Sequence, residues 1–171
     1  TEITETCPDT EEAEFASKLL QQLGVSLGGA REEEPKEIRP ESAFVVDEEK
    51  AHYFAVLIPV ETNKSEQVKA NTSDFNKEYF NSQRLRITSN LLNRTQQIVL
   101  VKSFGNKKKA IDYYTVYTGN REILIDVNTS GFNMFVISSS NYIELFKNKD
   151  VEGYTDFFNE HYLSENSKQA P

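Results

Sequence analysis

The order of hydrophobic and polar positions separates the chain into two parts. From residue 51 to residue 163, short runs rich in β-branched and aromatic residues alternate with stretches whose aromatic residues recur at helical spacing. The strongest strand-like runs cover residues 52–59, 97–104 and 132–138. Residues 1–50 show no such alternation. The pattern predicts one compact α+β domain over residues 51–163.

The first strand-like run is apolar on both of its alternating faces. Over residues 53–58, each of the two sets of alternate positions consists of apolar side chains. A strand of this kind is typical of the middle of a sheet that is covered on both sides. Pro59 cannot donate a hydrogen bond to a neighbouring strand, so we expect it to end this one.

A helix and a hairpin are predicted next. The polar residues 71–74 are expected to cap a helix that reaches about residue 82, with Phe75, Tyr79 and Phe80 on one face. The strand-like residues 85–92 and 96–104 follow, separated by a short polar turn. Their spacing predicts an antiparallel hairpin.

The second half of the domain repeats the alternation. A helix is predicted after Gly105 and Asn106, and Gly119 is expected to end it. We interpret residues 123–127 as a further short strand and residues 132–138 as the next strong one. Two short helices are then predicted, the first capped by residues 139–141 and the second marked by an aromatic stripe of Tyr154, Phe157, Phe158 and Tyr162.

The order of these elements predicts a ferredoxin-like split β-α-β sheet, written β-α-β-β-α-β, with a C-terminal helical extension. Two helices would lie on one face of the sheet. Because the first strand is apolar on both sides, the other face must also be covered. Three candidates for this cover remain open: Phe44-Val-Val46, the last helix, or a partner protein.

The ends of the chain differ from the domain in composition. Residues 1–24 are predicted to form a short amphipathic helix, and residues 25–50 an acidic linker rich in Gly, Pro and Glu. We expect residues 25–41 to be flexible and to be cut first by proteases. Residues 164–171 are expected to be a disordered tail. The chain starts without Met, which we interpret as an excised piece of a longer protein.

Composition and charge restrict the function. A chain of 171 residues with 37% hydrophobic residues can bury one good core. The net charge is −8, and residues 1–50 carry 14 acidic against 5 basic side chains, while the remainder carries 13 against 14. This balance argues against a nucleic-acid partner. Lys107-Lys-Lys109 is the only basic cluster, and we interpret it as a solvated face more readily than as a phosphate site.

No residue pattern indicates catalysis. His52 and His161 have no neighbouring metal-ligand pattern, which favours packing or surface roles. Asp74 and Glu78 form a carboxylate pair one turn apart, which we explain as acids in the first turn of a helix. Ser138-Ser-Ser-Asn141 lacks the glycines of a nucleophile elbow. We therefore predict no catalytic residue, no cofactor and no metal.

The single Cys7 allows neither an internal disulfide nor a multi-cysteine metal site, and its surroundings do not match a lipidation signal. No run of residues is long and apolar enough for a membrane span. Direct insertion into a membrane is therefore not expected.

A set of core and capping motifs spreads over residues 51–163. These motifs are His52-Tyr-Phe with Pro59, Ser73-Asp-Phe-Asn76, Val101 with Phe104, Ala110 with Tyr113, Phe135-Val-Ile-Ser138 with Asn141-Tyr142, and Phe157-Phe158 with Tyr162. The set resembles the C-terminal domain of Bacteroidota tetratricopeptide-repeat (TPR) lipoproteins of the gliding-motility and type IX secretion kind (SprE/PorW). The resemblance implies a periplasmic protein, tethered to the outer membrane through its parent, that assembles an envelope machine without enzymatic activity.

Two functions are carried forward. The first is a non-enzymatic protein-interaction module that docks through the sheet face or edge near residues 53–58 and the adjoining terminal segments, and the alternative is a small-ligand or peptidoglycan/glycan-binding module. An exposed apolar patch would favour the first function, and a polar cleft lined by aromatic residues would favour the second. Four aromatic residues are expected in the core: Tyr79, Tyr113, Phe135 and Phe158.

Overall fold

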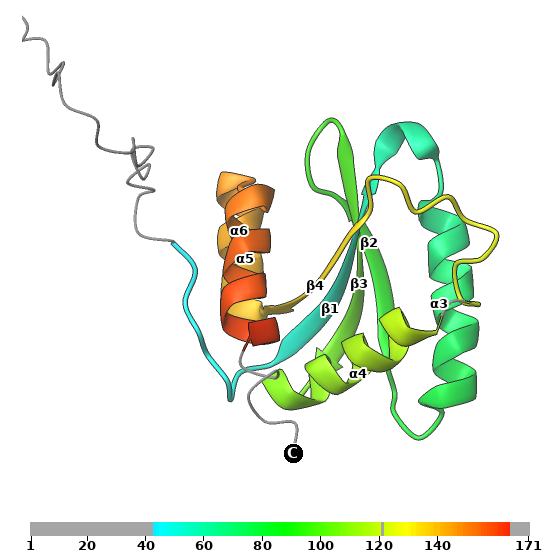
Figure 1. Cartoon of the computed structure of the whole chain (residues 1–171), viewed down its shortest axis with the longest axis horizontal. Coiled ribbons are helices and arrows are strands. Elements are labelled where there is room, and N and C mark those ends of the chain that lie inside the picture. Colours follow the sequence, from blue (N-terminus) through cyan, green and yellow to red (C-terminus); the bar gives the residue numbers. More distant parts are fainter. Residues whose placement is uncertain (1–42, 121, 165–171) are drawn as a thin grey trace, which may run out of the picture. The chain divides into compact units, whose positions relative to one another are not determined.

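The computed structural model describes residues 43–120 and 122–164 (Figure 1). All of them belong to one compact unit, Pro40–Pro171. The predicted helix over residues 1–24, most of the predicted linker and nearly all of the predicted tail lie outside the described residues. Within the described part, the chain is an α+β domain built on a four-stranded antiparallel sheet.

The sheet contains β1 (His52–Pro59), β2 (Arg86–Leu91), β3 (Gln96–Phe104) and β4 (Asn133–Ser138). Their order is β2-β3-β1-β4, and every neighbouring pair is antiparallel. The predicted central position of the first strand is confirmed, because β1 pairs with β3 on one side and with β4 on the other. The predicted hairpin is confirmed as β2 and β3.

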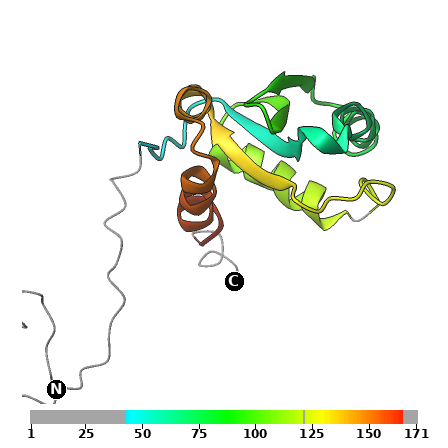
Figure 2. The ribbon, with the colours of Figure 1, turned by 90° about the horizontal axis from the view of Figure 1, so that it is seen from above.

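Two helices cover one face of the sheet. They are α3 (Ser65–Tyr79) and α4 (Lys107–Gly119), and α3 lies to the right of the sheet in Figures 1 and 2. On this face the ring of Phe54 packs against Tyr113 and Tyr117 of α4, at centroid distances of 5.2 and 4.7 Å. Aromatic rings therefore fill the space between the central strand and its helices.

The first helix begins earlier than predicted. It starts at Ser65, directly after a short helical turn at Val60–Thr62, and it does not start after a cap at residues 71–74. The polar residues inside it are used in tertiary hydrogen bonds: the Thr72 hydroxyl lies 2.9 Å from the Tyr117 hydroxyl, and the Tyr113 hydroxyl donates to Asn76 at 2.7 Å. These contacts keep polar residues within the helix, where local preference alone favours a cap.

The C-terminal helices cover the opposite face on its β4 side. They are α5 (Ser139–Asn148) and α6 (Val151–Phe158), which continues as a π-helical turn at Asn159–Leu163, and both lie to the left of the sheet in Figures 1 and 2. Tyr154 of α6 meets Phe135 of β4 at 4.9 Å and Phe44 at 4.8 Å. The last helix and the Phe44 segment together supply the cover that the sequence required.

Two further predictions are corrected. Residues 123–127 form turns instead of a strand, although Ile123 and Val127 are buried and Asn71 of α3 donates a hydrogen bond to the Ile123 carbonyl at 2.8 Å. Tyr113, Phe135 and Phe158 are core residues as predicted, but Tyr79 is 49% exposed and stacks on Phe75 at 4.8 Å. No helix among the described residues has the length and apolar character needed to cross a membrane.

Candidate functional site

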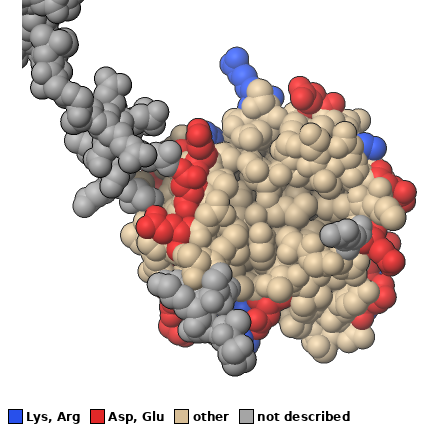
Figure 3. Space-filling model, viewed as in Figure 1, with Lys and Arg blue, Asp and Glu red and all other residues tan. Residues whose placement is uncertain are grey.

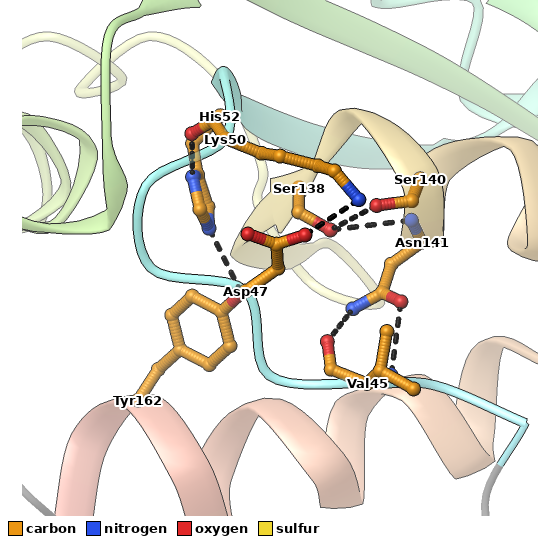
Figure 4. A network of polar contacts seen from close by, with 8 residues as sticks. All are labelled: Val45, Asp47, Lys50, His52, Ser138, Ser140, Asn141 and Tyr162. Atoms are coloured by element: carbon orange, nitrogen blue, oxygen red, sulfur yellow. Dashed lines mark hydrogen bonds and ion pairs between the residues drawn. The ribbon is translucent and has the colours of Figure 1, made fainter.

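His52 is buried at the start of β1, and both of its ring nitrogens are occupied (Figure 4). Nδ1 lies 2.7 Å from the Lys50 carbonyl oxygen, which can only accept, so Nδ1 carries the proton. Nε2 then accepts from the Tyr162 hydroxyl at 3.0 Å. Burial lowers the pKa of His52 below its ordinary value. His52 is therefore a neutral packing residue that ties β1 to the C-terminal helix.

The serine and asparagine residues at the end of β4 hold the segment around Val45, which precedes β1, in place (Figure 4). Ser138 accepts from the backbone N–H of Asn141 and so caps α5. The side chain of Asn141 accepts from Val45 N–H at 3.1 Å and donates to the Val45 carbonyl at 2.8 Å. This bidentate pairing imitates a strand contact, and it gives the Ser138-Ser-Ser-Asn141 stretch a structural role.

The beginning of the lysine cluster is not a solvated face. Lys107 is 9% exposed, and its Nζ donates to the His161 carbonyl at 3.0 Å and to Glu48 at 3.3 Å, while lying 4.8 Å from the Tyr162 ring centroid. Lys107 therefore joins α4 to the C-terminal helix. Lys108 and Lys109 are exposed as expected.

His161 does not face a metal-binding group. It is partly exposed, and its ring packs on Phe157 at 4.6 Å. The described residues contain no group of three or more His, Cys, Asp or Glu side chains placed to hold a metal ion. Cys7 lies outside the described residues.

Asp74 and Glu78 do not lie in the first turn of a helix but line an open, acidic hollow of about 260 Å³ beside α3. Acidic side chains, drawn in red, gather along the right of Figure 3, which is the side where α3 lies in Figure 1. The remaining lining residues come from α3 and from the loop before β4: Asn71, Phe75, Tyr79, Asn120, Glu122, Ile123 and Asp126. The hollow lies below the usual volume of ligand pockets, roughly 300 to 1,000 Å³. Its carboxylates and one exposed tyrosine ring suit a cationic or polyhydroxy ligand.

The two edges of the sheet differ in how their backbone groups are used. At β4, the buried Tyr154 donates its hydroxyl to the Val136 carbonyl at 2.7 Å, and α6 covers this edge. At β2, the ladder to β3 is complete from Arg86 to Leu91. No other hydrogen bond within the described part of the chain reaches the β2 backbone. The outer edge of β2 is therefore open.

The side chains of β2 do little to protect this edge. Natural sheets protect an edge with Lys, Pro, bulges or inward-pointing charges. After Arg86, the strand continues as Ile-Thr-Ser-Asn-Leu, without a charge or a proline. Leu91 is 58% exposed, and the Thr88 hydroxyl is buried without a hydrogen-bond partner among the described residues. The open edge is a candidate interaction surface.

The structure contradicts the part of the docking prediction that falls on residues 53–58. Residues 53–58 belong to the central strand, whose two edges are both paired and whose side chains are nearly all buried. The sequence did hold a signal for β2, because residues 87–91 form a strand-like run without charges next to a turn. Its position at the edge depends on strand order, which the sequence pattern does not display.

Comparison of the chain with models of known protein families, with curated proteins and with solved structures finds no match. We therefore infer a function from the geometry of the described residues. Two features stand out in that geometry: the open edge of β2 and the acidic hollow beside α3.

Proposed function

We propose that this domain is a non-enzymatic protein-interaction module whose β2 edge accepts an extended segment of a partner protein. The observation that carries the proposal is the difference between the two edges. The β4 edge is covered by α6 and hydrogen-bonded by Tyr154, whereas the outer backbone groups of β2 have no partner among the described residues. An added strand would supply those hydrogen bonds, as in other cases of β-strand addition.

The rest of the domain holds this edge ready for a partner. All six residues of β2 are in register with β3, from Arg86 opposite Lys102 to Leu91 opposite Gln97. Helix α3 packs against both strands on one face. A strand that is already ordered reduces the conformational entropy lost on binding.

The proposal includes the finer fold class, a ferredoxin-like split β-α-β sheet with a C-terminal helical extension. Its support is that β1 and β2 both pair antiparallel with β3, so they run parallel to each other with β3 between them. Strand β4 lies on the far side of β1. In this arrangement β2 is an outermost strand, which is what the docking proposal requires.

The resemblance to the gliding-motility and type IX secretion lipoproteins adds a location to the proposal. The partner would be a component of an envelope secretion or motility machine, and the domain would be periplasmic and tethered to the outer membrane through its parent. This placement rests on the sequence motifs quoted above. It is tested by purifying the full-length parent from its native envelope and identifying the proteins bound to it.

Strand addition is tested with a pair of proline variants, Thr88→Pro and Ser89→Pro. Neighbouring residues of an antiparallel strand direct their N–H groups to opposite edges, so one of the two prolines removes an outer donor and the other removes a ladder donor. The probe is a peptide of about eight residues with alternating valine and threonine, which is long enough to cover β2.

Amide hydrogen exchange of residues 86–91 then decides the outcome. We expect the probe to slow exchange there in the unaltered chain. The proline variant that retains the stability of the fold should lose this protection. Protection that falls on α4 or α5 instead, with residues 86–91 unchanged, would contradict docking at β2.

The alternative function, binding of a small ligand or glycan, is favoured by the acidic hollow. The exposed Tyr79 ring could stack on a sugar, and Asn71 and Asn120 supply amide groups beside the carboxylates. The test is a titration with a soluble peptidoglycan fragment, comparing Tyr79→Ala with Tyr142→Ala, which alters a tyrosine at the opposite face of the sheet. Selective loss of binding in Tyr79→Ala supports this function, and no binding to the unaltered chain contradicts it.

A further inference from the structure

We infer that the segment docking on β2 is acidic, with carboxylate side chains on alternate residues. This inference rests on the proposed function and names the chemistry of its partner. The first ground is charge. The β2–β3 hairpin and the three residues before it, residues 83–104, contain four basic residues and no acidic one. The whole chain, in contrast, has 27 acidic against 19 basic residues. The four are Arg84, Arg86, Arg94 and Lys102.

The arginine residues of this hairpin are available to a partner. Six of the described lysines form ion pairs with Asp or Glu side chains, for example Lys77 with Asp74 at 2.8 Å. Among the described residues, Arg84, Arg86 and Arg94 form no ion pair, and each is exposed. A guanidinium group binds a carboxylate through two parallel hydrogen bonds, which suits recognition of an acidic side chain.

Arg86 also lies in an unfavourable position within the sheet. It is directly opposite Lys102 on β3, so two positive side chains share one face of the sheet. Like charges opposite each other destabilise a strand pair. Lys102 is partly accommodated by the rings of Tyr53 and Tyr142, which lie 5.1 and 5.7 Å from its Nζ. A carboxylate on an added strand beside Arg86 would offset the remaining repulsion.

The alternation of β2 predicts the alternation of its partner. Arg86, Thr88 and Asn90 are the polar side chains of β2 and lie on the same face of the sheet as Lys102, whereas Ile87 shares the face of Val101 and Phe54, which the two helices α3 and α4 cover. A strand added to β2 has the same two faces. Acidic residues therefore fit the positions beside Arg86, and β-branched apolar residues fit those beside Ile87.

The test uses four peptides of about eight residues against the full chain, with binding followed by fluorescence anisotropy at low and high salt. One peptide alternates glutamate with valine, and the second alternates threonine with valine. The other two are their counterparts with prolines at two adjacent positions, which prevents strand addition but keeps the charge. We expect the glutamate peptide to bind most tightly. High salt should reduce its affinity more than it reduces the affinity of the threonine peptide.

Two matched variants locate the charge effect. Arg86→Gln should lower the affinity for the glutamate peptide by about two- to fivefold, as expected for the loss of one cross-strand charge pair. The affinity for the threonine peptide should not change. Lys109→Gln removes the same charge from an exposed position on α4 and should change the affinity for neither peptide. Equal weakening by both variants would mean a general effect of net charge and would overturn the inference.

The peptide set separates the two proposals. Equal binding of the glutamate and threonine peptides would overturn the acidic specificity and leave docking at β2 intact. Equal binding of the glutamate peptide and its proline counterpart would contradict strand addition itself. A peptide that binds only when it displaces a second copy of the chain, detected as a dimer by light scattering, would make the occupant another copy and overturn the acidic partner.

Discussion

At the scale of single residues, polar side chains in this domain mainly complete hydrogen bonds between elements. His52 joins β1 to the C-terminal helix, Asn141 holds the backbone of Val45, and Asn76 accepts from Tyr113 between α3 and α4. Buried polar groups are costly when they are left without partners, so these residues are needed for the fold itself. Each of the three therefore has a structural role in joining elements of the domain.

The buried His52 should make stability depend on pH. Its pKa is lowered in the folded state, so the unfolded chain binds more protons between that value and the ordinary value of 6.5. The free energy of unfolding should therefore be highest above about pH 6.5 and fall as the pH decreases toward the folded-state pKa. Denaturant unfolding at a series of pH values measures this.

The control for this prediction is the second histidine. His161→Gln should retain the fall in stability, because His161 is partly exposed, while His52→Gln should remove it. A fall of the same size in His52→Gln would assign the pH dependence to carboxylates.

Two aromatic residues of similar size should differ widely in their contribution to stability. Phe135 is fully buried between α6 and the sheet, so Phe135→Ala should lower the free energy of unfolding by about 3 to 5 kcal/mol. Tyr79 is half-exposed, so Tyr79→Ala should cost no more than about 1 kcal/mol. Chemical denaturation measures both, and equal costs would contradict the burial described here.

At the scale of elements, the sequence predicted those strands whose apolar pattern is set by burial. The three strong runs became β1, β3 and β4, and Asn106 caps α4 through its side chain. The errors arise where contacts with residues distant in the sequence determine the local structure. Thr72 and Asn76 looked like residues at or near a helix start but bond to tyrosines of another helix, and Ile123 is buried from a turn. The open β2 edge was missed, because no local pattern shows whether the outer backbone groups of a strand are covered by another part of the chain.

The closure of the β4 edge can be tested with Tyr154→Phe. The change removes the hydroxyl that donates to the Val136 carbonyl and leaves that buried carbonyl without this partner. We expect a loss of about 1 to 3 kcal/mol in the free energy of unfolding. Tyr142→Phe is the control, because its hydroxyl accepts a longer bond of 3.3 Å from the exposed Asn90 and should matter little. Equal effects would show that Tyr154 does not close the edge in this way.

At the scale of the whole domain, the sheet is covered unequally. Helices α3 and α4 pack on one face, and α5 and α6 cover the β4 side of the other (Figures 1 and 2). The β2 side of that second face carries Arg86, Thr88 and Asn90. One corner of the domain is thus polar, basic and open along a strand edge. The acidic hollow lies beside α3, on the other face of the sheet. Partners of opposite charge would therefore meet different parts of this domain.

Amide hydrogen exchange of the whole chain should reproduce this inequality. We expect the slowest exchange in β1, which is buried and paired on both edges, and slow exchange in β3, which lies between β1 and β2. In β2, alternate residues should exchange fast, because every second N–H points to the open edge. Uniformly slow exchange across Arg86–Leu91 would mean that another part of the chain or a second copy already covers this edge. Fast exchange at alternate residues that becomes slow when the glutamate peptide is added would place the peptide at the outer edge of β2.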